Sequence, residues 1–427
     1  MVLGAVAPFA VAAWWRLLPV VADRPGRVGD VAAFWHARHS WTELAQQLGL
    51  ALVDPRHARR LVPVGTGAAN AGAGLVIDPG EAGWIVPRLW FRRHRPWFRP
   101  GGWVATGRLP GGLTPEDFAV RVGSLVHAWR AYSIRVASPR RGWVTLTVLR
   151  EDPLSTPLAA VPVSGCADLR GLALGRGEDG GSWLVRLFGR HVLIAGATGA
   201  GKGSVQWSLI RSLLPLIRAG LVQVWTADPK RMEFRAGRPL FARYEHAPEA
   251  MVKLVEDAAV LMENRADALA GTTRQHEPSP AEPLIVLNLD ELGFLTAYQP
   301  DRKLRERFNA ALARVLTQGR AVGVLVVAAV QDPRKETVPL RALFPTRIAL
   351  RLDEPSQVDL VLGDGALSKG AACHEIPADE ATGAGIAYIT SDGDPIPRRV
   401  RAAYVSDVDI TAMVAEMAGD CPDEVSP

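Results

Sequence analysis

One run of residues, from His191 to Ser204, constrains the fold of this chain more than any other feature. It begins with four apolar residues, Val192–Ala195, which are typical of a buried strand, and continues as a glycine-rich loop. Lys202 then opens a segment, Val205–Ile217, whose apolar residues recur with a helical period. This order of strand, loop, lysine and helix is that of a loop that holds phosphate groups. The alternative is a tight turn with a solvated lysine.

The predicted phosphate loop departs from the usual pattern at one position. In such loops, backbone N–H groups turn toward the anion, the helix N-terminus adds positive partial charge, and the lysine reaches the outer phosphates. The next residue is normally Ser or Thr, whose hydroxyl holds Mg²⁺, but here it is Gly203. We predict that the hydroxyl of Ser204, or a water that it holds, takes the metal ion. The predicted nucleotide-binding residues are Gly196, Ala197, Thr198, Gly199, Ala200, Gly201, Lys202, Gly203 and Ser204.

Two acidic residues follow an apolar strand further along the chain. Leu284–Leu289 leads directly into Asp290 and Glu291. A carboxylate at a strand end beside a phosphate loop can hold Mg²⁺, and a second one can orient an attacking water. We therefore predict that Asp290 serves the metal and Glu291 the water, although an ordinary strand ending in a polar turn would give the same pattern.

Three other segments carry candidate residues. Gln331 ends the predicted strand 323–330, where it either reaches the terminal phosphate or only terminates the strand. Arg320 precedes that strand; it is either an arginine finger that reaches a neighbouring subunit's phosphate or a surface arginine near a helix end. Asp228–Glu233 follows the predicted strand 221–227, and its charges form either a network near the nucleotide or a plain loop.

The pattern of elements predicts an α/β fold from residue 191 to about residue 404. Continuous apolar runs such as Val322–Val330 indicate strands buried on both faces, and therefore a mostly parallel sheet. The predicted strands are 192–195, 221–227, 284–289, 323–330, 346–352 and 386–390, and the predicted helices are 202–217, 250–268 and 303–318.

The N-terminal third predicts a small α+β module. Its predicted helices are 31–53 and 114–129, the second with Thr114 as N-cap and Pro115 after it, and its predicted strands are 84–91, 103–109, 133–137 and 142–149. Residues 1–150 contain 19 Arg, no Lys and 8 acidic residues, which is a net charge of +11. Such a region can meet nucleic acid or an anionic membrane. Residues 90–100 interleave arginine with aromatic residues, which is typical of a nucleic-acid contact or of a solvated turn with packed arginines.

The segment 2–22 is the one candidate for a membrane anchor. Its length suits a single span, but Arg16, Pro8 and Pro19 interrupt it, so an amphipathic or buried helix is the alternative. Basic residues follow it, which would leave the rest of the chain in the cytoplasm, at the inner face of the membrane. The three cysteines show neither zinc nor disulfide spacing, which favours a reducing cytosolic setting.

Taken together, four motifs resemble those of the FtsK/SpoIIIE family of hexameric double-stranded DNA translocases. They are GATGAGKGS at 196–204, DPKRMEF at 228–234, the apolar run into Asp290 and Glu291, and GRAVGVLVVAAVQDP at 319–333. The resemblance covers about 191–404. Residues 101–150 are similar to the small domain before the family's motor. In size and in having a single motor, the chain is most similar to the TraB/TraSA-type plasmid transfer proteins of actinobacteria.

This resemblance implies a RecA-like P-loop NTPase and a role for each motif. Lys202 and the loop glycines would bind ATP, Asp290 would hold Mg²⁺, Glu291 would activate water, Gln331 would sense the γ-phosphate, and Arg320 would be the finger in trans. The partners implied are double-stranded DNA and further copies of the chain in a hexamer. The domain division predicted is 1–29, a hydrophobic leader; 30–82, a helical segment and linker; 83–152, the α+β domain; 153–407, the motor; and 408–427, an acidic tail.

Three hypotheses about function follow. The first is ATP-driven translocation of double-stranded DNA in conjugative plasmid transfer or chromosome segregation. The second is a protein-secretion ATPase of the type VII kind, although those proteins usually carry several motors on a longer chain. The third is a non-catalytic nucleotide-binding assembly protein, with Gly203 as a sign of decay; the retained Asp290 and Glu291 pair and Arg320 argue against it.

Overall fold

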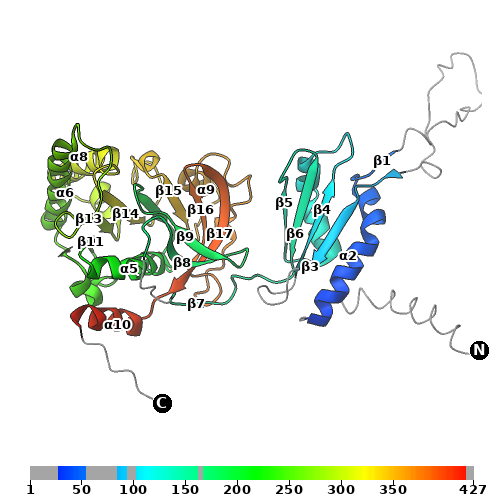
Figure 1. Cartoon of the computed structure of the whole chain (residues 1–427), viewed down its shortest axis with the longest axis horizontal. Helices are drawn as coiled ribbons and strands as arrows, with labels where there is room; N and C mark the ends of the chain where they lie inside the picture. Colours follow the sequence, from blue (N-terminus) through cyan, green and yellow to red (C-terminus); the bar gives the residue numbers. More distant parts are fainter. Residues whose placement is uncertain (1–26, 54–83, 94–101, 162–166, 420–427) are drawn as a thin grey trace, which may run out of the picture. The chain divides into compact units, whose positions relative to one another are not determined.

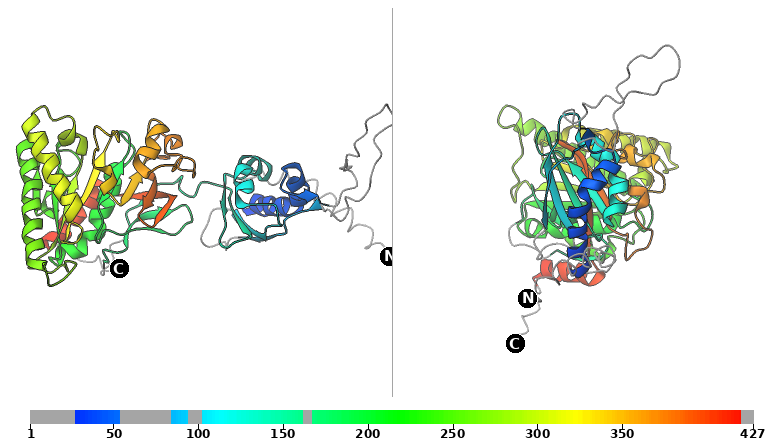
Figure 2. Two further views of the ribbon diagram at one scale, coloured as in Figure 1. Left: turned by 90° about the horizontal axis from the view of Figure 1, so that it is seen from above. Right: turned by 90° about the vertical axis from the view of Figure 1, so that its right-hand side faces the viewer.

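The computed structural model describes residues 27–53, 84–93, 102–161 and 167–419 of the chain. The chain divides into two compact units, Met1–Pro153 and Leu154–Pro427 (Figures 1 and 2). In the described ranges, no helix is both long and apolar enough to cross a membrane. The predicted anchor at 2–22 lies outside the described residues, as does most of the arginine-rich segment 90–100.

The N-terminal unit contains a four-stranded antiparallel sheet in the order β3-β4-β6-β5, with helices on one face. Buried residues alternate with partly exposed ones along β4 and β6, as expected for a sheet that buries one face. The fully buried side chains of Trp103, Phe118 and Trp129 join the sheet to the helices. The elements are α2 (Arg27–Gln47), β1 (Leu52–Val53), β2 (Trp84–Ile85), β3 (Leu89–Arg93), β4 (Gly102–Arg108), α3 (Pro115–Val120), α4 (Val122–Trp129), β5 (Ser133–Ala137) and β6 (Trp143–Leu149).

Two predicted elements of this unit have different limits in the structure. The helix predicted over 31–53 ends at Gln47, and Leu52–Val53 instead pairs with β2. The strand predicted over 84–91 is interrupted around Pro87, because proline lacks the N–H that a sheet ladder needs.

The helix predicted over 114–129 is two helices, because the backbone leaves the helical conformation at Arg121 (φ −95°, ψ 2°). Its predicted start is confirmed. The Thr114 N–H donates to Asp117 Oδ2 over 2.6 Å, and Pro115 is the first residue of α3.

The C-terminal unit is built on one large sheet in the order β12-β11-β13-β14-β10-β15-β16-β17-β8-β9, with β7 paired to β17. The strands from β12 to β15 are parallel, and those from β16 onward are antiparallel. The predicted mostly parallel α/β motor is therefore confirmed, whereas β8, β9 and β17 were not predicted. Because β10, β11, β13 and β14 run in one direction, their carboxyl ends meet at one edge.

The elements of this unit are β7 (Leu158–Ala159), β8 (Leu172–Gly177), β9 (Ser182–Val185), β10 (Val192–Ala195), α5 (Lys202–Arg218), β11 (Val222–Ala227), η1 (Arg235–Leu240), β12 (Arg243–Glu245), α6 (Pro248–Leu269), β13 (Leu284–Leu289), α7 (Leu292–Thr296), α8 (Arg302–Gln318), β14 (Val324–Val330), η2 (Arg341–Leu343), β15 (Thr346–Ala349), α9 (Ser356–Leu362), η3 (Cys373–Glu375), β16 (Ile386–Ser391), β17 (Asp394–Tyr404) and α10 (Asp407–Ala418).

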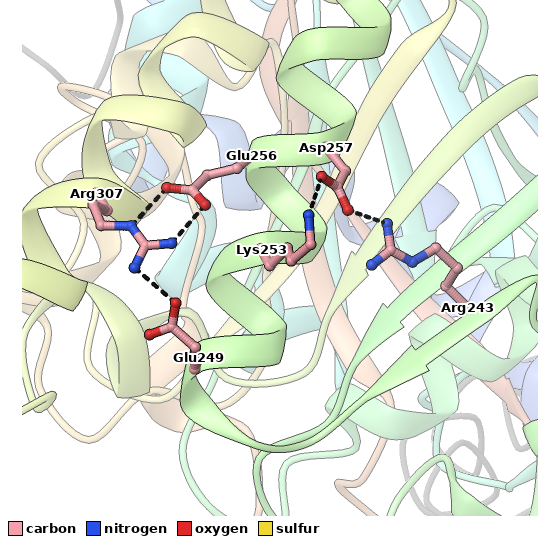
Figure 3. A network of polar contacts seen from close by, with 6 residues as sticks. All are labelled: Arg243, Glu249, Lys253, Glu256, Asp257 and Arg307. Carbon is pink, nitrogen blue, oxygen red and sulfur yellow. Dashed lines mark hydrogen bonds and ion pairs between the residues drawn. The ribbon is translucent and has the colours of Figure 1, made fainter.

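Helices cover both faces of this sheet. The apolar sides of α6 and α8 belong to one core cluster, and those of α5 and α10 to a second. On their outer side α6 and α8 are joined by Arg307, which contacts Glu249 and Glu256 over 2.7 Å each (Figure 3). These side chains are partly or largely exposed, so the pairs contribute little to stability, and the attachment of the two helices depends on the apolar core.

The acidic tail predicted from residue 408 is wrong for residues 408–418, which form most of α10. Ser406 caps this helix: its N–H donates to Asp409 Oδ2 over 2.9 Å, and its hydroxyl accepts from the Asp409 N–H over 3.2 Å. Ile410 and Met413 are buried and belong to the same cluster as α5. The capping pattern Ser-x-x-Asp was a visible signal in the sequence, but the acidic residues around it suggested a solvated end.

His191, which precedes β10, gives a test of this core. It is fully buried, its Nδ1 accepts the Val326 N–H over 3.0 Å, and burial lowers its pKa to about 3. Below pH 6.5 the unfolded chain binds a proton that the folded chain cannot, so stability falls as pH falls. Between pH 7.5 and 5.0, wild type should lose about 2 kcal/mol more than His191→Gln, which keeps an acceptor but does not titrate. Urea unfolding of both proteins at both pH values measures this loss of unfolding free energy. An equal loss in wild type and in His191→Gln would contradict the prediction.

Candidate nucleotide-binding site

Four strand ends bring the predicted site residues to one edge of the large sheet. The glycine-rich loop follows β10, and polar residues follow β11, β13 and β14. A cavity of about 750 Å³ opens there. Its lining includes Thr198, Gly199, Gly201, Lys202, Gly203, Ser204, Lys230, Glu233, Asp290 and Gln331.

The loop has the backbone of an anion-binding turn. Gly199 and Gly201 have positive φ (73° and 94°), a conformation that glycine adopts without strain. A Cβ on Gly201 would also lie 2.4 Å from the backbone nitrogen of Gly385, so only glycine fits there. The helix α5 begins directly at Lys202, and its free N–H groups face the loop.

Lys202 is folded back onto this loop. Its Nζ donates to the carbonyl oxygens of Gly196 (2.6 Å) and Ala197 (3.0 Å). Burial lowers its pKa to about 8, against the opposing effect of Glu291 and Asp290. The ammonium is therefore still mostly charged at neutral pH. A phosphate bound in the loop would raise the pKa of Lys202 again, because a nearby negative charge favours the protonated form.

Asp290 lines the cavity, and Glu291 lines a neighbouring pocket that shares Thr198, Lys230 and Gln331 with it. Asp290 Oδ2 and Glu291 Oε2 are buried and accept no hydrogen bond from the part of the chain that the structure describes. Burial raises the pKa of Asp290 to about 7, although Lys230 lowers it, and burial also raises the pKa of Glu291. Lys230 Nζ lies 3.7 Å from Glu291 Oε2, which is longer than a hydrogen bond. Buried carboxylate oxygens that accept no hydrogen bond suit a cation or a water.

Gln331 lies between the loop and the acidic pair. Its N–H donates to Glu291 Oε1 over 3.4 Å, and its Oε1 accepts from the Thr198 hydroxyl over 3.4 Å. The predicted residues at the ends of β13 and β14 are therefore brought together with the phosphate loop.

Gly203 has a specific neighbour. A Cβ built on it would lie 1.9 Å from Glu233 Oε1 and 2.5 Å from the Glu233 carboxyl carbon. The place that a hydroxyl side chain would fill is therefore taken by a carboxylate from the loop after β11. Ser204 lines the same cavity.

The residues present suit Mg²⁺ bound together with a nucleotide. The described residues contain no group of three or more His, Cys, Asp or Glu side chains placed to hold a metal ion by themselves. Mg²⁺ usually takes one or two carboxylates and completes its shell with phosphate oxygens and waters. The unpaired oxygen of Asp290 beside Lys202 meets that requirement.

Arg320 is not brought to this cavity. It lies before β14, and its Nε donates to the carbonyl oxygen of Gly189, which precedes β10. Both positions are at the amino ends of the parallel strands, which is the edge opposite the phosphate loop.

The sequence prediction missed Arg351, which follows β15. Its Nη2 donates to the carbonyl oxygen of Thr198 over 2.8 Å, and its Nη1 lies 3.2 Å from Asp353. It therefore braces the phosphate loop from the neighbouring strand. The sequence did contain a signal for this residue, because a charged side chain lay inside the strand predicted over 346–352. In the structure that strand ends at Ala349, before Arg351.

Comparison with known proteins agrees with this geometry. Residues 167–380 match the model of the FtsK/SpoIIIE family. The chain belongs to this family. Residues 28–150 match the N-terminal domain of actinomycete conjugal transfer proteins, so both parts of the predicted resemblance are confirmed.

Individual FtsK/SpoIIIE relatives are distant and longer. The chain is 25% identical over 318 residues to the DNA translocase FtsK of Listeria monocytogenes, covering 69% of this chain and 39% of the relative. It is 26% identical over 253 residues to the DNA translocase FtsK of Corynebacterium glutamicum, covering 52% and 25%. The chain thus spans less than half of the length of either relative.

A solved structure shares the fold. The monomer of the pCW3 conjugation coupling protein TcpA with ATPγS superposes with a TM-score of 0.54 at 17% identity, covering 78% of this chain and 93% of that one. The C-terminal unit therefore has the fold of the P-loop ATPases of the FtsK/SpoIIIE family.

Proposed function

We propose that this chain is an ATP-driven motor that moves double-stranded DNA in conjugative plasmid transfer. The observation that carries the proposal is that Lys202, Asp290 and Gln331 line one cavity, with Glu291 hydrogen-bonded to the backbone of Gln331, in a member of the FtsK/SpoIIIE family. The names of the curated relatives support DNA as the substrate. The match of residues 28–150 supports conjugation over chromosome segregation.

Each residue has a role that follows from its place. The loop N–H groups and Lys202 bind the ATP phosphates, and Asp290 holds the Mg²⁺ that neutralises charge on them. Glu291, whose buried Oε2 accepts no hydrogen bond from the described residues and lies 3.7 Å from Lys230 Nζ, orients the attacking water and accepts its proton. Gln331 contacts both Glu291 and the loop, so it can report whether the terminal phosphate is present.

The proposed assembly is a hexameric ring in the cytoplasm around duplex DNA. A motor that works on any sequence must bind the phosphate backbone rather than the bases. Its affinity for DNA should therefore fall steeply as salt rises, because binding releases condensed counterions.

The test is the ATPase rate of the purified full chain with and without linear duplex DNA, alongside sizing with an ATP analogue. Duplex DNA should raise the rate and sizing should give a ring. Glu291→Gln, which keeps the shape of the side chain but cannot accept the proton, should bind ATP normally and lose about 100-fold in rate.

Two outcomes would overturn the proposal. A rate that is indifferent to DNA but raised by a peptide substrate would indicate a protein-export motor. ATP binding without turnover in the wild-type chain would indicate an assembly protein.

A further inference from the structure

Gly203, the position after the lysine of the phosphate loop, lies directly beside the side chain of Glu233. A serine or threonine is usual there, and its hydroxyl serves Mg²⁺. In this chain a Cβ added at Gly203 would lie 1.9 Å from Glu233 Oε1, so a side chain at Gly203 would have to displace the Glu233 carboxylate from its present place. The glycine and the position of the carboxylate therefore go together in this structure.

The loop that carries Glu233 is held firmly at its first residue. Asp228 is fully buried, and its carboxylate accepts from the N–H groups of Arg231 (2.8 Å) and Phe234 (3.1 Å) and from the hydroxyl of Tyr244 (2.9 Å). Three donors on one buried carboxylate fix the path of the chain from Asp228 to Phe234.

The same loop is anchored again beside Glu233. The ring of Phe234 is fully buried and lies 5.2 Å from that of Trp207 on α5. The indole N–H of Trp207 donates to the carbonyl oxygen of Glu233 over 3.3 Å. The backbone of Glu233 is thus tied to α5 itself, one turn beyond Gly203, so the start of the Glu233 side chain is held beside Gly203.

We propose that Glu233 takes the place of the missing hydroxyl and, with Asp290, forms the protein side of the Mg²⁺ site, holding a water of the ion. Glu233 and Asp290 line the same cavity as Lys202, Gly203 and Ser204, from a different loop. Carboxylates are good acceptors for the waters that Mg²⁺ retains. Gly203 then leaves room for the carboxylate in this position. This inference rests on the proposed ATPase function and replaces Ser204 as the predicted metal-serving residue.

The experiment measures the affinity of the full chain for a fluorescent ADP with and without Mg²⁺. The ratio of the two dissociation constants reports how strongly the protein holds the metal with the nucleotide, independently of turnover. Glu233→Gln should reduce this ratio about tenfold, as expected for loss of an outer metal partner, while binding without Mg²⁺ stays within about twofold. Glu380→Gln is the matched control, because it removes one charge from an exposed position of the same cavity wall.

A double variant that enlarges residue 203 and shortens residue 233 tests whether the Glu233 carboxylate occupies the place of the missing hydroxyl. Gly203→Ser alone should also reduce the ratio, because its Cβ displaces the carboxylate. Gly203→Ser combined with Glu233→Ala should recover it, because a hydroxyl then returns to its usual place in a vacated space. Thermal melting of each variant verifies the fold.

The outcomes are distinguishable. An unchanged ratio in Glu233→Gln, with a reduced ratio in Ser204→Ala, would overturn the proposal and assign the metal to Ser204. A wild-type chain that binds ADP with Mg²⁺ as described but shows no stimulation by DNA would refute the DNA motor and leave the Glu233 assignment standing. A wild-type chain that binds no nucleotide would refute both.

Discussion

Lys202→Ala should lower the rate of ATP hydrolysis by about 10²–10³, the usual cost of removing one group that stabilises charge in the transition state. In the structure the ammonium donates to two carbonyl oxygens of the loop that it completes. It is therefore already positioned at the place where the phosphates would lie. Alanine removes the positive charge and also the two hydrogen bonds to the loop carbonyls, so nucleotide affinity should fall together with the rate.

A lysine outside the site provides the control. Lys253 lies on the outer side of α6, where its side chain is 66% exposed and contacts Asp257 (Figure 3). Lys253→Ala removes the same charge and should leave both rate and affinity unchanged. ATP turnover and equilibrium binding of a fluorescent nucleotide, measured on both variants, decide the matter; wild-type turnover in Lys202→Ala would mean that this loop is not the ATP site.

Most of this site was predictable from the sequence because parallel strands impose a simple rule. A strand buried on both faces reads as a continuous apolar run, and its carboxyl end shares an edge with its parallel neighbours. The runs before Gly196, Asp290 and Gln331 were therefore sufficient to place those residues together, and the cavity lined by all three motifs confirms the placement. This rule applies however many residues separate the three motifs in the sequence.

The contacts that were missed depend on side-chain direction and on loops. Nothing in the residue order indicates that Glu233 points at Gly203, since that depends on the turn fixed by Asp228 and on the ring of Trp207. Arg351 was likewise hidden inside a predicted strand. The antiparallel strands β8 and β17 were not predicted because they contain glycine, proline or charged residues, and β9 was not predicted because it has only four residues. The pairing of these strands is set by the rest of the sheet rather than by local pattern.

The second large prediction concerns Arg320. Its position distinguishes an action on the nucleotide of its own subunit from an action on the nucleotide of a neighbouring subunit. Its Nε is held by the carbonyl oxygen of Gly189 at the amino end of β10, and the four residues of β10 span roughly 13 Å of extended chain before the phosphate loop. It therefore cannot act on the nucleotide of its own subunit without leaving this edge. If it is an arginine finger in a ring, Arg320→Ala should bind ATP normally and lose about 10³ in turnover. Arg314→Ala, at an exposed arginine of α8 paired with Glu263, should lose nothing.

Co-assembly of two inactive variants tests the proposal directly. A ring that mixes Lys202→Ala and Arg320→Ala subunits contains some interfaces where an intact loop meets an intact arginine, so it should hydrolyse ATP faster than either variant alone. Activity of the co-expressed, co-purified mixture is compared with the sum of the separate activities. Turnover no greater than that sum, in a ring shown by sizing to be mixed, would place the arginine outside catalysis and leave it as the residue that ties the start of β14 to that of β10.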